Sequence, residues 1–259
     1  VPEILEVESY RRLAEQVVGR TVAEVEAPDA WYVKGGARPA DLVDALAGRR
    51  VTAVRRRGKL LLVDSGGPTL GLRFGMTGRL LVDGVASIEY LRWGARRRDP
   101  AWERFGLIFR GGGRLLIEDP RRLGGVELAP EEEALGPDAW SVTTGRLAIA
   151  LAGGRGPLKA RLLDQSRLAG LGNLLVDEIL WRAGLSPHRT AGSLDQDEER
   201  VLGRTIRSTV TSLDRRGGSH TGDLMPARGV GGCCPVDGDP LQRDVVGGRT
   251  TWWCPGHQR

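Results

Sequence analysis

The chain has 259 residues, of which 40% are hydrophobic and 27% charged, a composition that indicates a globular protein and excludes a disordered one. Basic side chains exceed acidic ones by five, which is compatible with nucleic acid as a partner without requiring it. Without an apolar run of membrane-spanning length, a secretory signal pattern or a disulfide framework (two of the three cysteines are adjacent), the sequence predicts a cytoplasmic protein.

The first half of the sequence predicts a lone helix followed by a β domain. Residues 3–18 place apolar side chains on one helical face, and Gly19 follows as a stop. From Thr21 to Leu128 the sequence consists of short β-rich runs separated by glycine, which is typical of a sandwich or barrel. The clearest of these runs are 51–54, 60–63, 80–82, 107–109 and 115–117.

The second half predicts helices and a terminal hairpin. Residues 129–138 are rich in Pro, Gly and Glu, so we expect a domain boundary there. Residues 139–216 have a helical pattern, with a capping box at Ser193 and Gln196. The fold class is therefore α+β, with an N-terminal helix and β-sandwich (1–128), a helical domain (129–225) and a hairpin finger (226–259).

The turn Gly170-Leu171-Gly172-Asn173 separates two predicted helices. Glycines let a backbone approach a ligand closely, and a helix N-terminus offers N–H groups to an anion. With the Asn173 side chain as a further donor, this turn is suited to binding a phosphate. An ordinary helix–helix turn with an Asn cap is the alternative that the motif alone leaves open.

The C-terminal finger contains two pairs of candidate metal ligands. Cys234 and Asp237 form the first pair, Cys254 and His257 the second, and each pair has two intervening residues. Such pairs across a hairpin predict a tetrahedral structural zinc site, in which Cys233 is an alternative to Asp237. A metal-free hairpin with free thiols is the other interpretation.

Pro2 and Glu3 form a good helix start, and they also have a chemical interpretation. If Val1 is removed from the mature protein, Pro2 exposes a secondary amine, which is a nucleophile toward a sugar C1′. Glu3 is adjacent and able to give or take a proton. The chain also retains only three lysines (Lys34, Lys59 and Lys159) among 38 basic residues, so a retained lysine is a candidate for a role that arginine cannot fill.

Taken together, these motifs make the chain similar over its whole length to the Fpg/Nei family of DNA glycosylases and AP lyases. Five segments carry the resemblance, in family order: Pro2-Glu3-Ile4-Leu5-Glu6-Val7-Glu8, Arg56-Arg57-Gly58-Lys59, Gly75-Met76-Thr77-Gly78, Asp119-Pro120-Arg121-Arg122-Leu123-Gly124, and Asp164-Gln165 through Gly172-Asn173, the helix–two-turn–helix signature. The resemblance implies a monomeric bacterial repair enzyme, associated with the nucleoid, that binds damaged double-stranded DNA and needs only structural zinc.

The resemblance also implies roles for individual residues. Catalytic roles fall to Pro2 as the Schiff-base nucleophile, Glu3 as the acid and Lys59 beside the lesion phosphate, with Glu6 in the lesion pocket. Void-filling roles, which occupy the gap left by a flipped nucleotide, fall to Met76, Arg121 and Leu123. Phosphate contacts fall to Asn173 and Arg249, and to the backbone of Gly170 and Gly172.

Several positions depart from the Fpg pattern. Leu123 stands in place of Phe, Arg73 in place of His and Leu5 in place of Pro, while Asp237 and His257 replace finger cysteines. The segment 219–225 leaves little room for a loop that caps 8-oxoguanine. We therefore expect oxidised pyrimidines, ring-opened purines, hydantoins or abasic sites to be preferred.

Two other functions remain open at this point. One is a non-catalytic damaged-DNA-binding protein on the same scaffold, which retention of Val1 would favour because an acylated proline nitrogen has no lone pair to offer. The other is a zinc-finger DNA-binding protein without preference for lesions.

Overall fold

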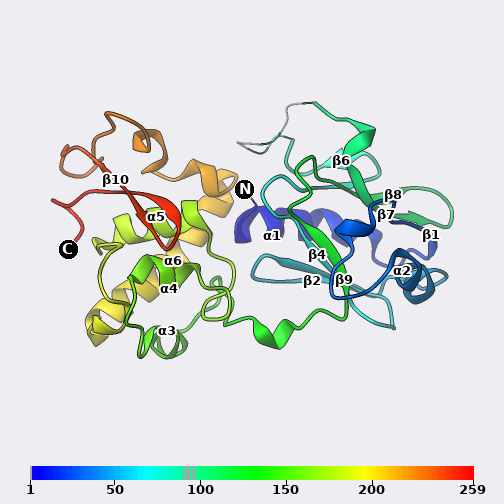
Figure 1. Cartoon of the computed structure of the whole chain (residues 1–259), viewed down its shortest axis with the longest axis horizontal. Helices are drawn as coiled ribbons and strands as arrows, with labels where there is room; N and C mark the ends of the chain where they lie inside the picture. Colours follow the sequence, from blue (N-terminus) through cyan, green and yellow to red (C-terminus); the bar gives the residue numbers. More distant parts are fainter. Residues whose placement is uncertain (1, 90, 92–93, 95–96) are drawn as a thin grey trace. The chain divides into compact units, whose positions relative to one another are not determined.

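The structure, a computed structural model, describes residues 2–89, 91, 94 and 97–259 (Figure 1). Val1, on whose removal the role of Pro2 depends, lies outside these residues. The chain divides into two compact units. Unit 1 contains Pro2 and Glu6–Glu132, and unit 2 contains Glu3–Leu5 and Glu133–Arg259. The start of the chain therefore contributes to both units.

Unit 1 holds two antiparallel sheets. The five-stranded sheet has the order β1-β7-β8-β5-β6, with strands β1 (Val22–Glu26), β5 (Arg79–Val82), β6 (Val85–Ala86), β7 (Glu103–Phe109) and β8 (Arg114–Glu118). The four-stranded sheet has the order β2-β3-β4-β9, with strands β2 (Ala53–Arg57), β3 (Leu60–Asp64), β4 (Leu70–Arg73) and β9 (Gly125–Leu128). Helices α1 (Ile4–Ala14) and α2 (Pro39–Leu46) complete the unit.

Both sheets supply side chains to one hydrophobic core. Alternate residues of a strand point to the same face, and Leu61 and Val63 of β3 share this core with Leu80 and Val82 of β5. Helix α1 adds Val7 and other apolar residues to it. A core lined by two sheets confirms the predicted sandwich.

Unit 2 contains four helices and a hairpin among its described residues. The helices are α3 (Thr144–Leu151), α4 (Leu158–Leu163), α5 (Asn173–Ala183) and α6 (Gln196–Arg216), and the hairpin strands are β10 (Gln242–Val246) and β11 (Arg249–Trp253). Their core is built from the apolar stripe of α6, the buried face of α5 and the first residues of α1, including Ile4 and Leu5. Short 3-10 turns in the two units lie at Glu15–Val17, Ala30–Tyr32, Pro100–Trp102, Glu132–Ala134, Ala191–Ser193, Ser219–Thr221 and Met225–Ala227.

The structure corrects some local predictions. The capping box of α6 is formed by Asp195 and Glu198, because Ser193 lies in a 3-10 turn and bonds the Thr190 carbonyl instead. The predicted first helix becomes a 3-10 turn after Ala14. The sequence analysis also missed α2, whose eight residues lie within the β-rich half.

Across the described residues, every helix is too short or too polar to cross a lipid bilayer.

Candidate functional site

The side chain of Glu3 caps the N-terminus of helix α5. Its carboxylate oxygens accept hydrogen bonds from three backbone N–H groups at 2.8, 2.9 and 3.2 Å, those of Gly172, Leu174 and Leu175. Glu3 is only 1% exposed, so these donors replace the water that a buried carboxylate loses. The positive potential of a helix N-terminus stabilises the negative charge further. This carboxylate is therefore held in one position, directly after Pro2.

The two glycines before α5 allow the start of the chain to approach this helix. A Cβ atom on Gly172 would lie 2.3 Å from the carboxyl carbon of Glu3. Gly170 has a φ of +112°, and a Cβ there would lie 2.5 Å from Ile4. Both glycine N–H groups are bonded within the protein, to Glu3 and to Gln165 Oε1, whereas the sequence predicted that they face a phosphate.

Asn173 is the first residue of α5, and it connects this helix to the C-terminal hairpin. Its Nδ2 donates to the Thr250 carbonyl at 2.9 Å, one residue after Arg249. Within the described residues, the backbone N–H of Asn173 has no protein acceptor. Arg249 is exposed at the first position of β11. Asn173 and Arg249, which are predicted to contact phosphates, thus lie on two segments that are joined by a hydrogen bond.

A buried ionic cluster joins α4, α5 and the hairpin. Lys159 is fully buried, and its Nζ donates to Asp177 Oδ1 at 2.6 Å, Thr251 Oγ1 at 2.8 Å and the Thr250 carbonyl at 3.1 Å. The other oxygen of Asp177 accepts from Arg228 at 2.7 Å. Burial lowers the pKa of Lys159 and raises the pKa of Asp177, and the attraction between the two charges opposes both shifts. This cluster fixes strand β11 against α5.

The other residues predicted for catalysis lie in unit 1. Pro2 is buried directly before α1, and Glu6, which is 5% exposed, lies in the first turn of that helix. Lys59 is half-buried in the turn between β2 and β3. Arg56 of β2 donates to Glu8 of α1 at 3.1 Å. This ion pair ties α1 to the strand that leads into the Lys59 turn.

Two of the three residues predicted to fill a void come from loops that touch each other. Nη1 of Arg121 lies 3.7 Å from Sδ of Met76. The fully buried Asp119 accepts from Thr77 Oγ1 at 2.6 Å and from the Gly124 N–H at 2.8 Å. One carboxylate therefore holds both loops.

The third void-filling candidate follows a residue with an uncommon backbone conformation. Arg122 has a φ of +55°, and its guanidinium makes two hydrogen bonds of 2.6 Å to Asp29. The hydrogen bonds from Arg122 hold the pKa of the Asp29 carboxyl below its usual range. Leu123 comes next and is 50% exposed, so its side chain is available for contact.

Sequence reasoning missed the buried carboxylates that support the site. Asp119 is the first residue of the 119–124 motif, and Asp177 lies one helical turn after Asn173. In both cases the signal in the sequence was that the carboxylate lies beside a motif residue. Glu178 is a third case. It accepts the N–H groups of Asp223 and Leu224 at 2.9 and 3.0 Å, and it thereby fixes the segment 219–225.

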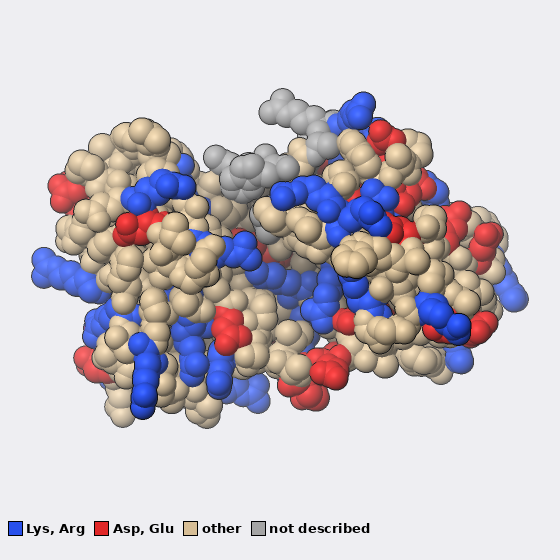
Figure 2. Space-filling model, viewed as in Figure 1, with Lys and Arg blue, Asp and Glu red and all other residues tan. Residues whose placement is uncertain are grey.

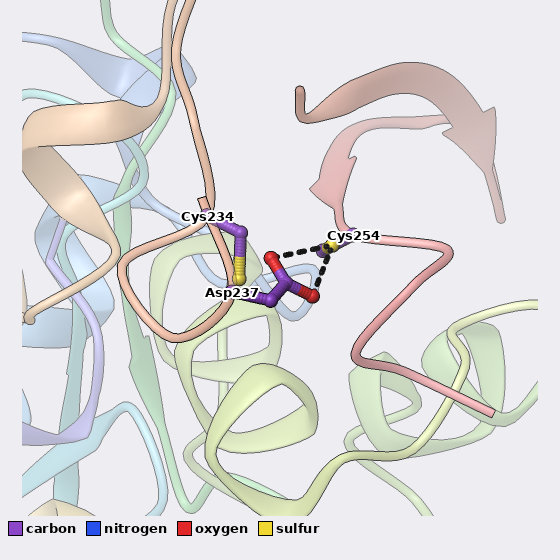
Figure 3. A group of neighbouring side chains, drawn as sticks. All are labelled: Cys234, Asp237 and Cys254. Atoms are coloured by element: carbon purple, nitrogen blue, oxygen red, sulfur yellow. Dashed lines mark hydrogen bonds between the residues drawn. The ribbon is translucent and has the colours of Figure 1, made fainter. Parts of the chain in front are cut away.

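The finger brings three of its four predicted ligands together. The ligand atoms of Cys234, Asp237 and Cys254 lie within 4.8 Å of one another, and Figure 3 shows the Asp237 carboxylate directed at the Cys254 sulfur. Burial raises the pKa of the Cys254 thiol to about 11. His257 lies outside this group and its Nε2 contacts the Trp181 carbonyl at 2.8 Å. Cys233 is exposed and also lies outside it.

Comparison with known proteins agrees with this geometry. The model of the formamidopyrimidine-DNA glycosylase N-terminal domain matches residues 1–126, and that of the H2TH domain of the same enzymes matches residues 134–222. The formamidopyrimidine-DNA glycosylase of Paracoccus denitrificans is 37% identical over 98% of this chain and 99% of its own. That of Methylococcus capsulatus is 33% identical over the full length of both.

Solved structures give the same result. The Lactococcus lactis Fpg (MutM) bound to DNA that contains N7-benzyl-Fapy-dG has a TM-score of 0.82 and 26% identity, with both chains fully covered. The complex of Lactococcus lactis Fpg with DNA that contains an abasic site has a TM-score of 0.82 and 25% identity, again over both whole chains. The chain therefore belongs to the formamidopyrimidine-DNA glycosylase family.

Proposed function

We propose that this protein is a bifunctional DNA glycosylase and AP lyase of base excision repair that acts through the amine of Pro2. Family membership over the whole chain supports the reaction class. The hydrogen bonds from the N-terminus of α5 to the Glu3 carboxylate carry the assignment of the site, because they fix the backbone next to Pro2. The chemistry requires that Pro2 be the first residue of the mature protein.

The reaction starts with attack of the neutral Pro2 nitrogen on C1′. A bond forms between that nitrogen and C1′, the glycosidic bond breaks, and the base leaves with its electron pair and takes up a proton. The three N–H donors around Glu3 bind its ionised form, so Glu3 first accepts the proton that the Pro2 amine loses. Glu3 then returns this proton to the ring oxygen as the sugar opens to an iminium ion. Loss of a C2′ proton from that ion expels the 3′ phosphate, and a second elimination expels the 5′ phosphate.

DNA binding rests on phosphate contacts from both units. In unit 2 the free N–H and the side-chain amide of Asn173, together with Arg249, are the donors. In unit 1 the donor is Lys59 in the β2–β3 turn. Met76, Arg121 and Leu123 fill the space that a flipped nucleotide leaves, and Glu6 lines the lesion pocket.

Structural zinc in the finger is the second part of the proposal. Two thiolates and a carboxylate are a donor set that suits this ion, and Cys234, Asp237 and Cys254 already lie close together. His257 or a water molecule takes the fourth position. Metal analysis of the purified protein tests the assignment. We expect one zinc per chain, loss of the metal in Cys254→Ser, and loss in His257→Ala only if the histidine is the fourth ligand.

The preferred substrates are oxidised pyrimidines, ring-opened purines, hydantoins and abasic sites. The hydrogen bonds from Asp223 and Leu224 to Glu178 support this choice, because they tie down the short segment 219–225. A panel of defined lesions in duplex DNA tests it. Efficient excision of 8-oxoguanine with poor excision of the others would contradict it. We also propose that the protein acts as a monomer on DNA in the bacterial cytoplasm, at the nucleoid, and the bacterial origin of its relatives supports the cytoplasmic location.

Borohydride trapping on an abasic duplex tests the enzymatic assignment. We expect a covalent adduct with the wild-type protein and none with Glu3→Gln, while Glu24→Gln, an exposed residue of β1, is the control. Specific binding of damaged duplex without any adduct would favour the non-catalytic damage-binding protein. Equal binding of damaged and intact duplex would favour a general DNA-binding protein.

A further inference from the structure

Helix α6 carries a shallow groove on its surface that the proposed reaction does not use. The groove has a volume of about 620 Å³ and is lined entirely by side chains of this helix. They are four arginines and three hydroxyl residues: Arg204, Arg207, Ser208, Thr211, Ser212, Arg215 and Arg216. The opposite face of α6 is the apolar stripe in the core of unit 2, so the groove side is free for a partner.

The groove carries positive charge only, although this part of the chain is nearly neutral. Residues 133–259 contain 16 basic and 14 acidic side chains and are therefore nearly neutral. Figure 2 shows acidic side chains among the basic ones on the face it displays. The α6 groove, by contrast, is lined by four cations and no anion.

Two of these arginines have no competing partner. Arg216 pairs with Asp223 at 2.7 Å, and Arg207 donates to the Val142 carbonyl at 2.8 Å. Arg204 and Arg215 make no ion pair with any described residue, and both are exposed. Their charges are therefore fully available to an external anion.

The spacing of the two free arginines fits an extended polyanion. They are eleven residues apart on one helix, which corresponds to about 16 Å along its axis. The same length of duplex DNA carries roughly ten phosphate charges. Ser208 and Thr211 lie between the arginines at helical spacing and add hydroxyl donors of the kind that contact phosphate oxygens.

We propose that the α6 groove is a second DNA-binding surface, which holds the phosphate backbone of undamaged duplex outside the lesion site. It lets the protein stay on DNA while a lesion is not engaged. The inference rests on the proposed function only in taking DNA, rather than another polyanion, as the occupant. Guanidinium and hydroxyl groups are the side chains that most often contact phosphate oxygens, and we take these contacts, which do not depend on base sequence, as the binding mode.

The test is the affinity of the double variant Arg204→Ala/Arg215→Ala for an undamaged 30-base-pair duplex at several salt concentrations. Each lost phosphate contact lowers the slope of log K against log salt by about 0.9, so we expect a decrease of about 1.8 and at least a tenfold weaker Kd near 0.1 M salt. Arg200→Ala is the matched control, because Arg200 lies on the same helix, is exposed and pairs with Asp197 outside the groove. An unchanged slope in the double variant would overturn the proposal.

Two further measurements separate this proposal from the lesion chemistry. Single-turnover cleavage of a 13-base-pair abasic duplex should be unchanged in the double variant, because this DNA is held at the lesion site. A parallel loss of that cleavage would place the arginines in the lesion site and contradict a second surface. Weaker binding of polyglutamate with unchanged DNA binding would assign the groove to an acidic protein instead, and it would also refute the proposal.

Discussion

Replacement of Gly172 by alanine tests the site without removing any reactive group. The new Cβ would lie 2.3 Å from the Glu3 carboxyl carbon, whereas carbon atoms in contact are about 3.5–4.0 Å apart. The carboxylate must therefore retreat by about 1.2–1.7 Å, and its hydrogen bonds to the first turn of α5 are lost or distorted. A displacement of about 1 Å at a reacting group can cost about 100-fold in rate. We expect a loss of that size.

Single-turnover base excision at saturating enzyme is the appropriate assay, because it separates the chemical step from product release. Gly145→Ala is the control, since Gly145 lies in helix α3 of the same unit and a Cβ there meets nothing within 4 Å. Binding of undamaged duplex should be nearly the same in both variants. An excision rate of Gly172→Ala within threefold of wild type would refute the role assigned to the position of Glu3.

Three other predictions follow from the same contacts. Lys159→Met leaves the buried Asp177 with Arg228 as its main partner and should destabilise the protein by about 3 kcal/mol, seen as a lower Tm. Lys34→Met, at a half-buried lysine whose Nζ bonds the Trp31 carbonyl and no carboxylate, is the control and should lower Tm by much less. Hydrogen bonds from Arg55 lower the pKa values of Asp64 and Glu132, so the stability that these carboxylates contribute is present above their unfolded-state pKa values and is lost as pH falls below about 4. Urea titrations at about pH 7 and about pH 3.5 should therefore show a smaller loss of unfolding free energy on acidification in Arg55→Met than in the wild type. An equal loss in the two proteins would contradict the assignment. Asn173→Ala and Arg249→Ala should each weaken binding of all duplexes, but only Arg249→Ala removes a charge and should reduce the salt slope, by up to about 1; an unchanged slope in Arg249→Ala would count against that phosphate contact.

Periodicity and turn chemistry predicted much of the fold. The short β-rich runs separated by glycine predicted the sandwich, and the helical pattern of 139–216 predicted the helices of unit 2, because both patterns are fixed by local geometry. The capping box was displaced by two residues, since Asp195 competes with Ser193 for the same role and both satisfy the local rule. Helix α2 was missed, because eight residues among strands are too few to establish a helical period.

The supporting residues of the site were hidden for a different reason. Pro2, Glu3 and Asn173 belong to recognisable motifs, but the bond from Glu3 to Gly172 joins residues 169 positions apart. Sequence pattern carries no signal for such a contact. The same holds for Lys159, whose partners Thr250 and Thr251 lie more than 90 residues away. The sequence indicated Lys159 as a candidate, because it is one of few lysines in an arginine-rich chain, but its partners became known only from the structure.

The proposed mechanism requires that the protein become covalently bound to deoxyribose through the nitrogen of Pro2. Peptide mass spectrometry of the borohydride-reduced adduct, with the protein made in a bacterial host, tests it most directly. We expect a mature chain that begins at Pro2 and carries the sugar remnant on that residue. A remnant on a lysine, or a chain that retains Val1 and still forms the adduct, would contradict it.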